Sequence, residues 1–512
     1  MSAGTRTELL HMLRRALRLS LASELPAKEL VESRRDFLKK SAVIAGGSLL
    51  ASCGSPDRAS RSGPRIAIVG AGVAGLNAAW QLKKKGLTAS IYEASNRIGG
   101  RMFSTKDLMA PGLVTELGGE FIDSHHVDML ALCKEFDLKL WDVDDAYRGV
   151  TEDAYFFGGR MIKEADIIDA FRPLVPRLKP DMALCENVDF ENPGQAGALD
   201  NTSIAGYLDQ LGVSGWFRSL LETAFVTEYG LEIEEQSCLN LLTIISADEK
   251  DGFKPYGESD ERYKVSGGNM RVCTELARRL REHIQLERRL EAIRSKGLGF
   301  QLGLRDSEGR SFDVDADYVI LALPFTTLRA VDIQVDLPPI KRKTIAELGY
   351  GAGAKLLVGV KKRVWSGFGF RGDCFSDEPF QMAWDNSMCQ PGEAGGLTIF
   401  QGGQRVTELG KGSPADQVAR LIPGVEKLYP GTTAALSGRN SRFMWATHPL
   451  TLGSYACYRP GQWTTIAGAE IKPVGQLLFA GEHCSLDFQG FMNGGAQTGR
   501  LAAESILAAV QK

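Results

Sequence analysis

The chain has 512 residues, of which 44% are hydrophobic and 24% are charged. This length and composition predict a soluble globular protein with two domains. The 60 basic and 63 acidic side chains nearly cancel, which argues against a nucleic-acid binder and a polybasic membrane-surface protein. Nine cysteines without a C-x-x-C pair argue against a disulfide scaffold and a zinc site. We expect no metal site, and we expect the neighbours His125 and His126 to lie in an exposed loop.

The first part of the chain is predicted to be an export signal. Residues 34–40 read Arg-Arg-Asp-Phe-Leu-Lys-Lys after Ser33, and an apolar run follows over residues 42–51. This run is shorter than the roughly 20 residues that a membrane-spanning helix needs. A charged segment followed by a short apolar one is typical of a secretory signal. The order of residues resembles the twin-arginine signal, whose route exports folded proteins.

A short cysteine-containing motif closes the apolar run. Leu50-Ala51-Ser52-Cys53 resembles a bacterial lipobox, which makes Cys53 a candidate lipid anchor. Residues 1–53 are therefore assigned to the signal, and residues 54–64, rich in Ser, Arg, Gly and Pro, to a tether. Residues 1–33 are either an extension of the signal or the product of an overcalled start codon. We expect a periplasmic protein or a membrane-anchored lipoprotein.

A dinucleotide-binding fingerprint begins at residue 65. Residues 65–69 are a β-branched run that predicts a buried strand, and Gly70-Ala71-Gly72-Val73-Ala74-Gly75 leads from it into a predicted helix. Gly70 allows the tight turn, Gly72 lets a pyrophosphate approach the backbone, and Gly75 lets helix and strand pack closely. The helix N-terminus offers N–H groups to the phosphates.

A second predicted strand, over residues 88–92, ends in Glu93. This carboxylate is placed to accept hydrogen bonds from the ribose hydroxyls. A G-x-G-x-x-G motif alone is a weak signal, but here the strand, the helix and the acidic residue are all present. The sequence therefore predicts a Rossmann-type dinucleotide site.

Four further blocks indicate which dinucleotide is bound. Residues 93–101 read Glu-Ala-Ser-Asn-Arg-Ile-Gly-Gly-Arg, and residues 116–121 read Glu-Leu-Gly-Gly-Glu-Phe. Near the C-terminus, residues 476–483 read Gln-Leu-Leu-Phe-Ala-Gly-Glu-His, and residues 490–495 read Gly-Phe-Met-Asn-Gly-Gly. These blocks resemble the FAD-dependent amine oxidase superfamily, which includes monoamine oxidase, polyamine oxidase and L-amino-acid oxidase.

The resemblance implies an FAD site and a role for each block. The Gly-Gly-Arg segment would run along the flavin, the Leu-Gly-Gly segment would lie near the isoalloxazine, and Glu482 would lie beside the ribityl chain. The helix that starts near Met492 would point its positive end at the flavin. The predicted cofactor-binding residues are Gly70, Gly72, Ala74, Gly75, Glu93, Ala94, Arg97, Gly99, Gly100, Arg101, Leu117, Gly118, Gly119, Glu120, Gly481, Glu482, Phe491 and Met492.

The resemblance also implies an α/β fold with two domains. A Rossmann-like FAD-binding domain would be assembled from residues 65–125, 263–330 and 445–512. An α+β substrate-binding domain would be formed by residues 126–262 and 331–444. Hydrophobic patterns within these segments predict helices over 127–136 and 271–280, and strands over 317–323, 356–360 and 476–479.

A lysine is the first candidate for catalysis. Gly351-Ala352-Gly353-Ala354-Lys355 precedes the aliphatic strand, and by composition alone Lys355 would be a solvated residue at a strand start. The resemblance instead implies that Lys355 holds a water against flavin N5. There it would assist reoxidation by oxygen or orient the water that hydrolyses the imine.

Two aromatic residues are the other catalytic candidates. In monoamine oxidases two aromatic rings flank the flavin face, and Tyr455 and Phe491 stand at the matching positions. Such walls exclude water and steer an uncharged amine. The phenylalanine departs from the tyrosine of the animal enzymes, which puts a full phenolic cage in doubt. Ser454 replaces the cysteine that bonds to the flavin there, so non-covalent FAD is predicted.

The choice between amines and amino acids depends on charge near the flavin. The secreted animal L-amino-acid oxidases carry a carboxylate-binding arginine after the Leu-Gly segment, where this chain has Glu120. An acidic group there favours a cationic amine, although Arg371, Arg442 or Arg459 could supply a carboxylate grip from elsewhere.

The predicted function is therefore an FAD-dependent oxidase that deaminates a primary or secondary amine. Hydride would pass to flavin N5, and O2 would accept the electrons to give H2O2 and an imine that hydrolyses to a carbonyl. An L-amino-acid oxidase with the same chemistry is the alternative. An FAD-dependent desaturase and a non-catalytic flavin lipoprotein are remote alternatives.

Overall fold

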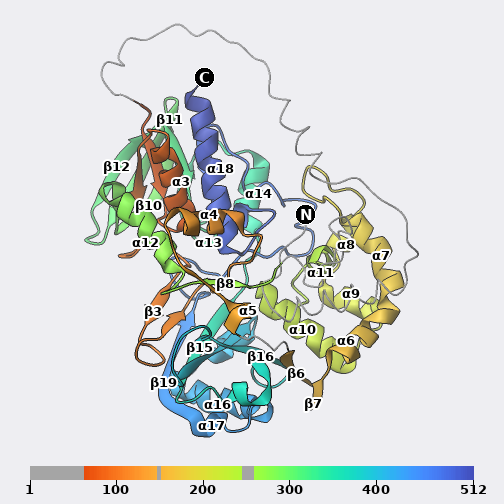
Figure 1. The fold of residues 1–512 in the computed structure, drawn as a ribbon. Helices are drawn as coiled ribbons and strands as arrows, with labels where there is room; N and C mark the ends of the chain where they lie inside the picture. The colour runs from red at the N-terminus through yellow and green to blue at the C-terminus, as the bar shows by residue number, and fades with distance from the viewer. Residues whose placement is uncertain (1–62, 147–151, 245–258, 512) are drawn as a thin grey trace.

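The computed structural model describes residues 63–146, 152–244 and 259–511 (Figure 1). The predicted signal and all but the last two residues of the predicted tether lie outside the described residues. Among the helices within the described ranges, none combines the length and the apolar composition that crossing a membrane requires.

A parallel sheet of five strands forms the centre of the first part, in the order β20-β13-β1-β2-β9. All four residues of β1 are buried, as expected of a parallel strand that is covered on both faces. The structure confirms the strands predicted at the fingerprint and at both later blocks. Their bounds are β1 (Ile66–Val69), β2 (Ala89–Tyr92), β9 (Ile284–Gln285), β13 (Tyr318–Leu321) and β20 (Leu477–Phe479).

Helices α3 (Val73–Lys84) and α18 (Met492–Val510) pack side by side next to this sheet (Figure 1). The Asn77 side chain of α3 donates a hydrogen bond of 2.7 Å to the Ala496 carbonyl of α18. Helix α12 (Met270–Arg279) contacts α3 from a third chain segment. The helices that follow the two glycine-rich blocks are thereby brought together, as the sequence predicts.

Around this centre lie smaller sheets and helices. A four-stranded sheet has the order β12-β11-β10-β14, and two antiparallel pairs are formed by β3 with β4 and by β5 with β8. The bounds are β3 (Ser104–Lys106), β4 (Val114–Glu116), β5 (Leu140–Asp142), β8 (Tyr263–Val265), β10 (Arg288–Lys296), β11 (Gly299–Asp306), β12 (Ser311–Ala316), β14 (Asp332–Gln334) and α13 (Phe325–Leu328).

The second part is built on a seven-stranded sheet in the order β19-β15-β18-β17-β16-β6-β7. All eight residues of β15, the strand next to the edge strand β19, are buried, and helix α16 (Pro414–Leu428) packs against β15 and β19. The predicted strand over 356–360 is confirmed within β15. The strands are β6 (Glu152–Phe157), β7 (Arg160–Ile162), β15 (Gly353–Val360), β16 (Phe370–Ser376), β17 (Met382–Asp385), β18 (Gly395–Gly402) and β19 (Leu436–Met444).

A group of helices flanks one end of the seven-stranded sheet (Figure 1). Helix α10 contacts β6, β16 and β18, and its buried face includes Phe225 and Tyr229. The helices are α6 (Glu164–Phe171), α7 (Val175–Leu184), α8 (Gly197–Asp200), α9 (Ile204–Leu211), α10 (Gly215–Tyr229) and α11 (Cys238–Ile244).

Two helices assigned by the sequence to the substrate-binding domain pack instead with the first part. Met129 and Leu132 of α4 (Val127–Glu135) join the core that contains α3 and α18, and Arg500 of α18 pairs with Asp128 at 2.6 Å. In α14 (Pro339–Glu347), Lys341 donates to the Glu470 carbonyl at 2.8 Å. The packing of both helices is determined by their apolar faces and by these polar contacts. Hydrophobic periodicity predicts which face of a helix is buried but not which element it packs against.

Candidate active site

A cavity of about 540 Å³ lies where the two parts meet, lined by the turn after β1 and by residues of the seven-stranded sheet. All three predicted catalytic residues, Lys355, Tyr455 and Phe491, line it. Leu117 and Gly75 do not: Leu117 packs in a small core, and Gly75 lies inside α3. The predicted cofactor residues that line it are Gly70, Gly72, Ala74, Glu93, Ala94, Arg97, Gly99, Gly100, Arg101, Gly118, Gly119, Glu120, Gly481, Glu482, Phe491 and Met492.

The three fingerprint glycines differ in what surrounds them. Gly70 has a φ of +106°, and a Cβ on it would lie 2.5 Å from the Ala322 carbonyl oxygen. A Cβ on Gly75 would overlap the Gly70 carbonyl oxygen. Gly72 has no neighbour nearer than the Gly100 Cα at 3.9 Å, so only there would a side chain point into open cavity rather than into protein.

Glu93 lies at the cavity wall and is fixed by the backbone around it. Its two carboxylate oxygens accept hydrogen bonds from the Ala71 N–H at 2.7 Å and the Ser95 N–H at 2.9 Å. Each carboxylate oxygen can accept more than one hydrogen bond. The side chain is therefore held in place while it keeps capacity to accept a ribose hydroxyl.

Glu482 ties three distant segments together beside the cavity. Its carboxylate accepts from the Arg101 guanidinium at 2.8 Å and from the Gly490 N–H at 2.7 Å. The same Arg101 nitrogen donates to the Ser454 carbonyl at 2.7 Å. Glu482, which is predicted to lie beside the ribityl chain, is thus a buried, charged residue that links these segments.

The N-terminus of α18 also reaches the cavity, through Phe491, Met492 and Gly495. The N-cap residues of this helix and of α3, Phe491 and Gly72, make no side-chain cap hydrogen bond, so N–H groups at both ends can bind a ligand. A Cβ on Gly119 would lie 2.7 Å from Met492 Cγ. Two helix N-termini, a glycine-lined floor and an acidic group fit a dinucleotide with a pyrophosphate and a ribose.

Lys355 is almost completely buried and fully hydrogen-bonded. Its ammonium donates to the Glu116 carbonyl at 3.1 Å, the Gly118 carbonyl at 2.9 Å and the Glu120 carboxylate at 2.8 Å. A lysine ammonium has three N–H donors, so all of them are used by the protein. This geometry supports a fixed positive charge rather than the water-holding role that the resemblance implies.

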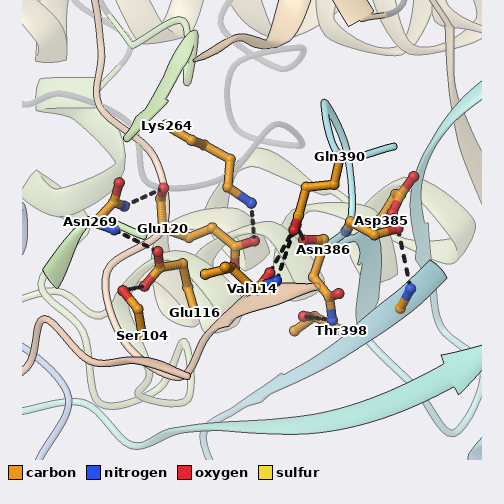
Figure 2. A network of polar contacts seen from close by, with 12 residues as sticks. Ser104, Val114, Glu116, Glu120, Lys264, Asn269, Asp385, Asn386, Gln390 and Thr398 are labelled. Carbon is orange, nitrogen blue, oxygen red and sulfur yellow. Dashed lines mark hydrogen bonds and ion pairs between the residues drawn. The ribbon is translucent and has the colours of Figure 1, made fainter. Parts of the chain in front are cut away.

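Glu120 is engaged on both oxygens, by Lys355 and by Lys264 of β8, each at 2.8 Å. Figure 2 shows the contact with Lys264. Burial alone would raise the pKa of Glu120, but the two ammonium groups outweigh it and lower that pKa below its ordinary value. Because two ammonium groups already compensate its negative charge, Glu120 does not present a net negative charge to a substrate ammonium. The inference that it favours a cationic amine is wrong, because the sequence did not reveal its two lysine partners.

A second buried carboxyl group supports the same loop. Glu116 accepts hydrogen bonds of 2.7 Å from the Asn269 N–H and from the Ser104 hydroxyl (Figure 2). The Asn269 side chain donates to the Gly119 carbonyl at 3.1 Å. Burial raises the pKa of Glu116. Asn269, at the start of α12, thus fixes the loop that carries Glu120.

The rest of the cavity wall is largely aromatic. The Tyr455 hydroxyl donates to the Thr227 carbonyl at 3.0 Å, and the rings of Trp384 and Phe400 lie 6.1 Å apart. The Lys355 ammonium lies 5.1 Å from the centre of the Trp384 ring. These two residues were not predicted from the sequence, because strands β17 and β18 carry no motif and each contains a single aromatic residue.

Ser454, which stands where monoamine oxidases carry the cysteine that bonds to the flavin, lines the cavity. Its hydroxyl donates to the Gly353 carbonyl at 3.2 Å. A serine hydroxyl forms no thioether, which is consistent with FAD held by non-covalent contacts.

Two of the three arginines considered as carboxylate grips are bonded elsewhere. Arg442 donates to the Leu409 carbonyl at 2.5 Å, and Arg459 pairs with Glu235 at 2.9 Å. Neither lines the cavity. The side chain of Arg371 lies outside the described part of the chain.

The histidine pair is not in an exposed loop as predicted, since His126 is fully buried. Its ring lies 5.0 Å from the ring of Phe491 in an edge-on contact. His126 Nδ1 accepts from the Asp123 N–H at 3.0 Å, which leaves the proton on Nε2, 3.3 Å from the Asp123 carboxylate. Asp123, His125 and His126 cluster closely, but a protonated Nε2 cannot ligate a metal ion.

Comparisons with known proteins agree with this geometry. A model of the family described as flavin containing amine oxidoreductase matches residues 73–507. A flavin-containing amine oxidase of Danio rerio is 24% identical over 471 residues, covering 87% of this chain and 86% of the relative. The (S)-6-hydroxynicotine oxidase of Paenarthrobacter nicotinovorans is 25% identical over 446 residues, covering 86% of this chain and 98% of the relative.

Among solved structures, the cyclohexylamine oxidase from Brevibacterium oxydans IH-35A superposes with a TM-score of 0.75. The sequence identity is 23%, and the match covers 88% of this chain and 100% of that one. At this identity the likeness concerns the fold, and it confirms the predicted α/β architecture of two parts.

Proposed function

Because this chain belongs to the family of flavin containing amine oxidoreductases, and is therefore an FAD-dependent oxidase of carbon–nitrogen bonds, we propose that its substrate is a primary or secondary amine. Oxygen is the proposed electron acceptor, and the proposed products are H2O2 and an imine that hydrolyses to a carbonyl. The single observation that carries the choice of an amine is the wall of the cavity on the side of the seven-stranded sheet.

That wall offers no described group suited to grip a carboxylate. Within the described residues, the side chains that this sheet and the facing helix contribute are Thr227, Lys355, Asp373, Phe375, Met382, Trp384 and Phe400. The one cation among them is Lys355, and its three N–H groups donate to acceptors within the protein. The lining arginines Arg97, Arg101, Arg288 and Arg289 belong to the part that carries the dinucleotide fingerprint.

The FAD is proposed to lie across the glycine-lined floor. The N–H groups at the start of α3 would bind its pyrophosphate, Glu93 its ribose, and the start of α18 would face its ring. Bound FAD supplies the two-electron oxidation, accepting a hydride from the carbon next to nitrogen.

The chain's own residues position the amine and exclude water. Tyr455 and Phe491 are proposed to flank the substrate, and Trp384 and Phe400 to enclose its remaining surface. Tyr455 is held by its hydrogen bond to Thr227, and Phe491 by its contact with His126. A rigid aromatic wall favours an uncharged amine, because a neutral group loses less hydration free energy on burial than a cation does.

The substrate class is tested with matched pairs of compounds under anaerobic conditions. Phenethylamine with phenylalanine, and putrescine with ornithine, are mixed with the FAD-bound protein while the flavin absorbance is followed. Bleaching by the amines alone would support the proposal. Bleaching by the amino acids alone would replace it with an L-amino-acid oxidase, and no bleaching at all would favour a desaturase or a non-catalytic flavoprotein.

The export route is a separate proposal, which rests on residues 34–53 of the sequence. A twin-arginine signal would carry the folded protein across the membrane with FAD already bound, and Cys53 would then receive a lipid. Replacement of Arg34 and Arg35 by Lys should leave a reporter fusion in the cytoplasm. A Cys53→Ser variant should move from the membrane fraction to the soluble periplasmic fraction; unchanged fractionation of both variants would refute the two assignments.

A further inference from the structure

Two buried lysines share one carboxylate in the wall of the cavity. Lys355 comes from β15, Lys264 from β8, and Glu120 from the loop after β4. Both N–O distances are 2.8 Å, and the exposed fractions of the three side chains are 8%, 4% and 4%. Three separate elements therefore converge to bury two ammonium groups against a single carboxylate.

The charges in this cluster do not cancel. Two ammonium groups and one carboxylate leave a net charge of +1. Burial alone would lower the pKa of Lys264, but Glu120 outweighs burial and raises that pKa, so Lys264 stays protonated. Lone buried charges are costly unless they are paired and hydrogen-bonded. Glu120 pairs with both lysines, the Glu116 and Gly118 carbonyls also accept from Lys355, and nearby carboxyl groups also raise the pKa of Lys264.

Two further buried carboxyl groups, Glu116 and Asp385, lie near the cluster, and both raise the pKa of Lys264. Burial raises the pKa of both Glu116 and Asp385. Glu116 accepts hydrogen bonds from Asn269 and Ser104, and Asp385 accepts one from the Ser387 N–H at 2.8 Å. The two ion pairs of 2.8 Å that the lysines form are both with Glu120.

We propose that Glu120 is a positioning residue that fixes Lys355 in the cavity wall, and that the Lys355–Glu120–Lys264 cluster sets the reduction potential of the bound flavin through its single net positive charge. This inference rests on the proposed function in one respect, namely that FAD occupies the cavity. A fixed positive charge in a site that excludes water favours the added electrons and so raises the reduction potential.

The charge balance predicts the sign of the effect for each variant. Glu120→Gln keeps the shape and leaves two ammonium groups, so the net charge becomes +2 and the midpoint potential should shift to a more positive value. Lys264→Gln leaves Lys355 paired with Glu120, so the net charge becomes 0 and the potential should shift to a more negative value. The double variant returns to +1 and should lie near the wild type.

The midpoint potential of the full chain with FAD bound is the measurement, made by reduction with dithionite in the presence of a reference dye. Shifts of opposite sign in the single variants, reversed in the double variant, would support the inference. Shifts of the same sign, or unchanged potentials, would overturn it, because a structural disturbance carries no sign of charge.

Two conservative variants keep the test decisive if a neutral variant loses FAD. Glu120→Asp and Lys264→Arg preserve every charge and should keep the wild-type potential, and a shift in either would overturn the inference. The measurement uses no amine, so its outcome is independent of the substrate test. Bleaching by amines together with unchanged potentials would reject the charge cluster alone, whereas shifted potentials without bleaching would reject the amine alone.

Discussion

Arg101 and Glu482 form an ion pair of 2.8 Å across 381 positions of the sequence. The pair joins the first and the last segments of the part that carries the dinucleotide fingerprint, and both residues line the cavity. Since the Glu482 side chain is only 8% exposed, its charge is stabilised mainly by Arg101 and by nearby N–H groups. Cofactor binding and the closure of the fold should therefore depend on the same contact.

Glu482→Gln is expected to weaken FAD binding by about 10- to 100-fold, because a hydrogen bond to a charged group contributes roughly 1.5–3 kcal/mol. The affinity can be measured by titrating the apoprotein with FAD and following flavin fluorescence. Glu504→Gln on the exposed face of α18 is the matched control and should bind FAD as the wild type does. Equal affinities for all three proteins would contradict the role assigned to Glu482.

Two glycine substitutions should separate folding from cofactor binding. Gly75→Ala places a methyl group against the Gly70 carbonyl oxygen, so the apoprotein should lose thermal stability. Gly72→Ala meets nothing nearer than 3.9 Å and should keep the melting temperature of the apoprotein while it blocks the approach of the pyrophosphate. Thermal denaturation and FAD titration of both variants test this. A stable Gly75→Ala protein would show that helix α3 can shift.

Tyr455 tests whether the cavity wall acts through its ring or its hydroxyl. Tyr455→Phe removes the hydroxyl, which donates to the Thr227 carbonyl, and kcat/KM for the best amine should fall by less than about 10-fold. Tyr455→Leu removes the aromatic face and should lower kcat/KM considerably more, with FAD binding retained. A larger loss in the Phe variant than in the Leu variant would assign the main effect to the hydroxyl.

The parts of the site that the sequence predicts well are those built from local backbone. Gly70, Gly72 and Glu93 act through a turn and a helix start within one strand–helix–strand unit, so their spacing alone places them at the cavity. Lys355 could be found only through resemblance, since a lysine at a strand start is ordinarily solvated. Its role changes once Glu120 is seen beside it.

The features that the sequence does not predict depend on contacts between distant segments. Lys264 reaches Glu120 because β8 pairs with β5 and lies beside the loop after β4. His126 is buried because Phe491, which starts the last helix, packs against its ring. Neither contact leaves a periodic pattern in the sequence, and a polar residue in a connecting segment is by default predicted to be exposed.

The buried Glu470 should make the stability of the protein depend on pH. Burial raises the pKa of this carboxyl group from an ordinary value of 4.5 to about 7. Its oxygens face the Tyr458 hydroxyl at 3.1 Å and the Gly468 N–H at 2.7 Å. Because the folded state binds the proton more tightly than the unfolded state does, this stabilisation is complete below pH 4.5 and is lost as the pH rises towards 7.

Glu470→Gln mimics the protonated acid, since its amide oxygen can accept from Gly468 and its NH2 group can donate to Tyr458. The variant should remove the Glu470 contribution to the pH slope between pH 4.5 and 7, and be more stable than the wild type at pH 7. Lys341, whose pKa burial lowers to about 8, stays protonated through most of this range and adds little slope. Melting temperatures across the range, with the exposed Glu393→Gln as control, provide the measurement. Parallel curves for the wild type and Glu470→Gln would show that Glu470 is ionised in the folded protein throughout, and that Tyr458 and Gly468 stabilise its charge rather than its proton.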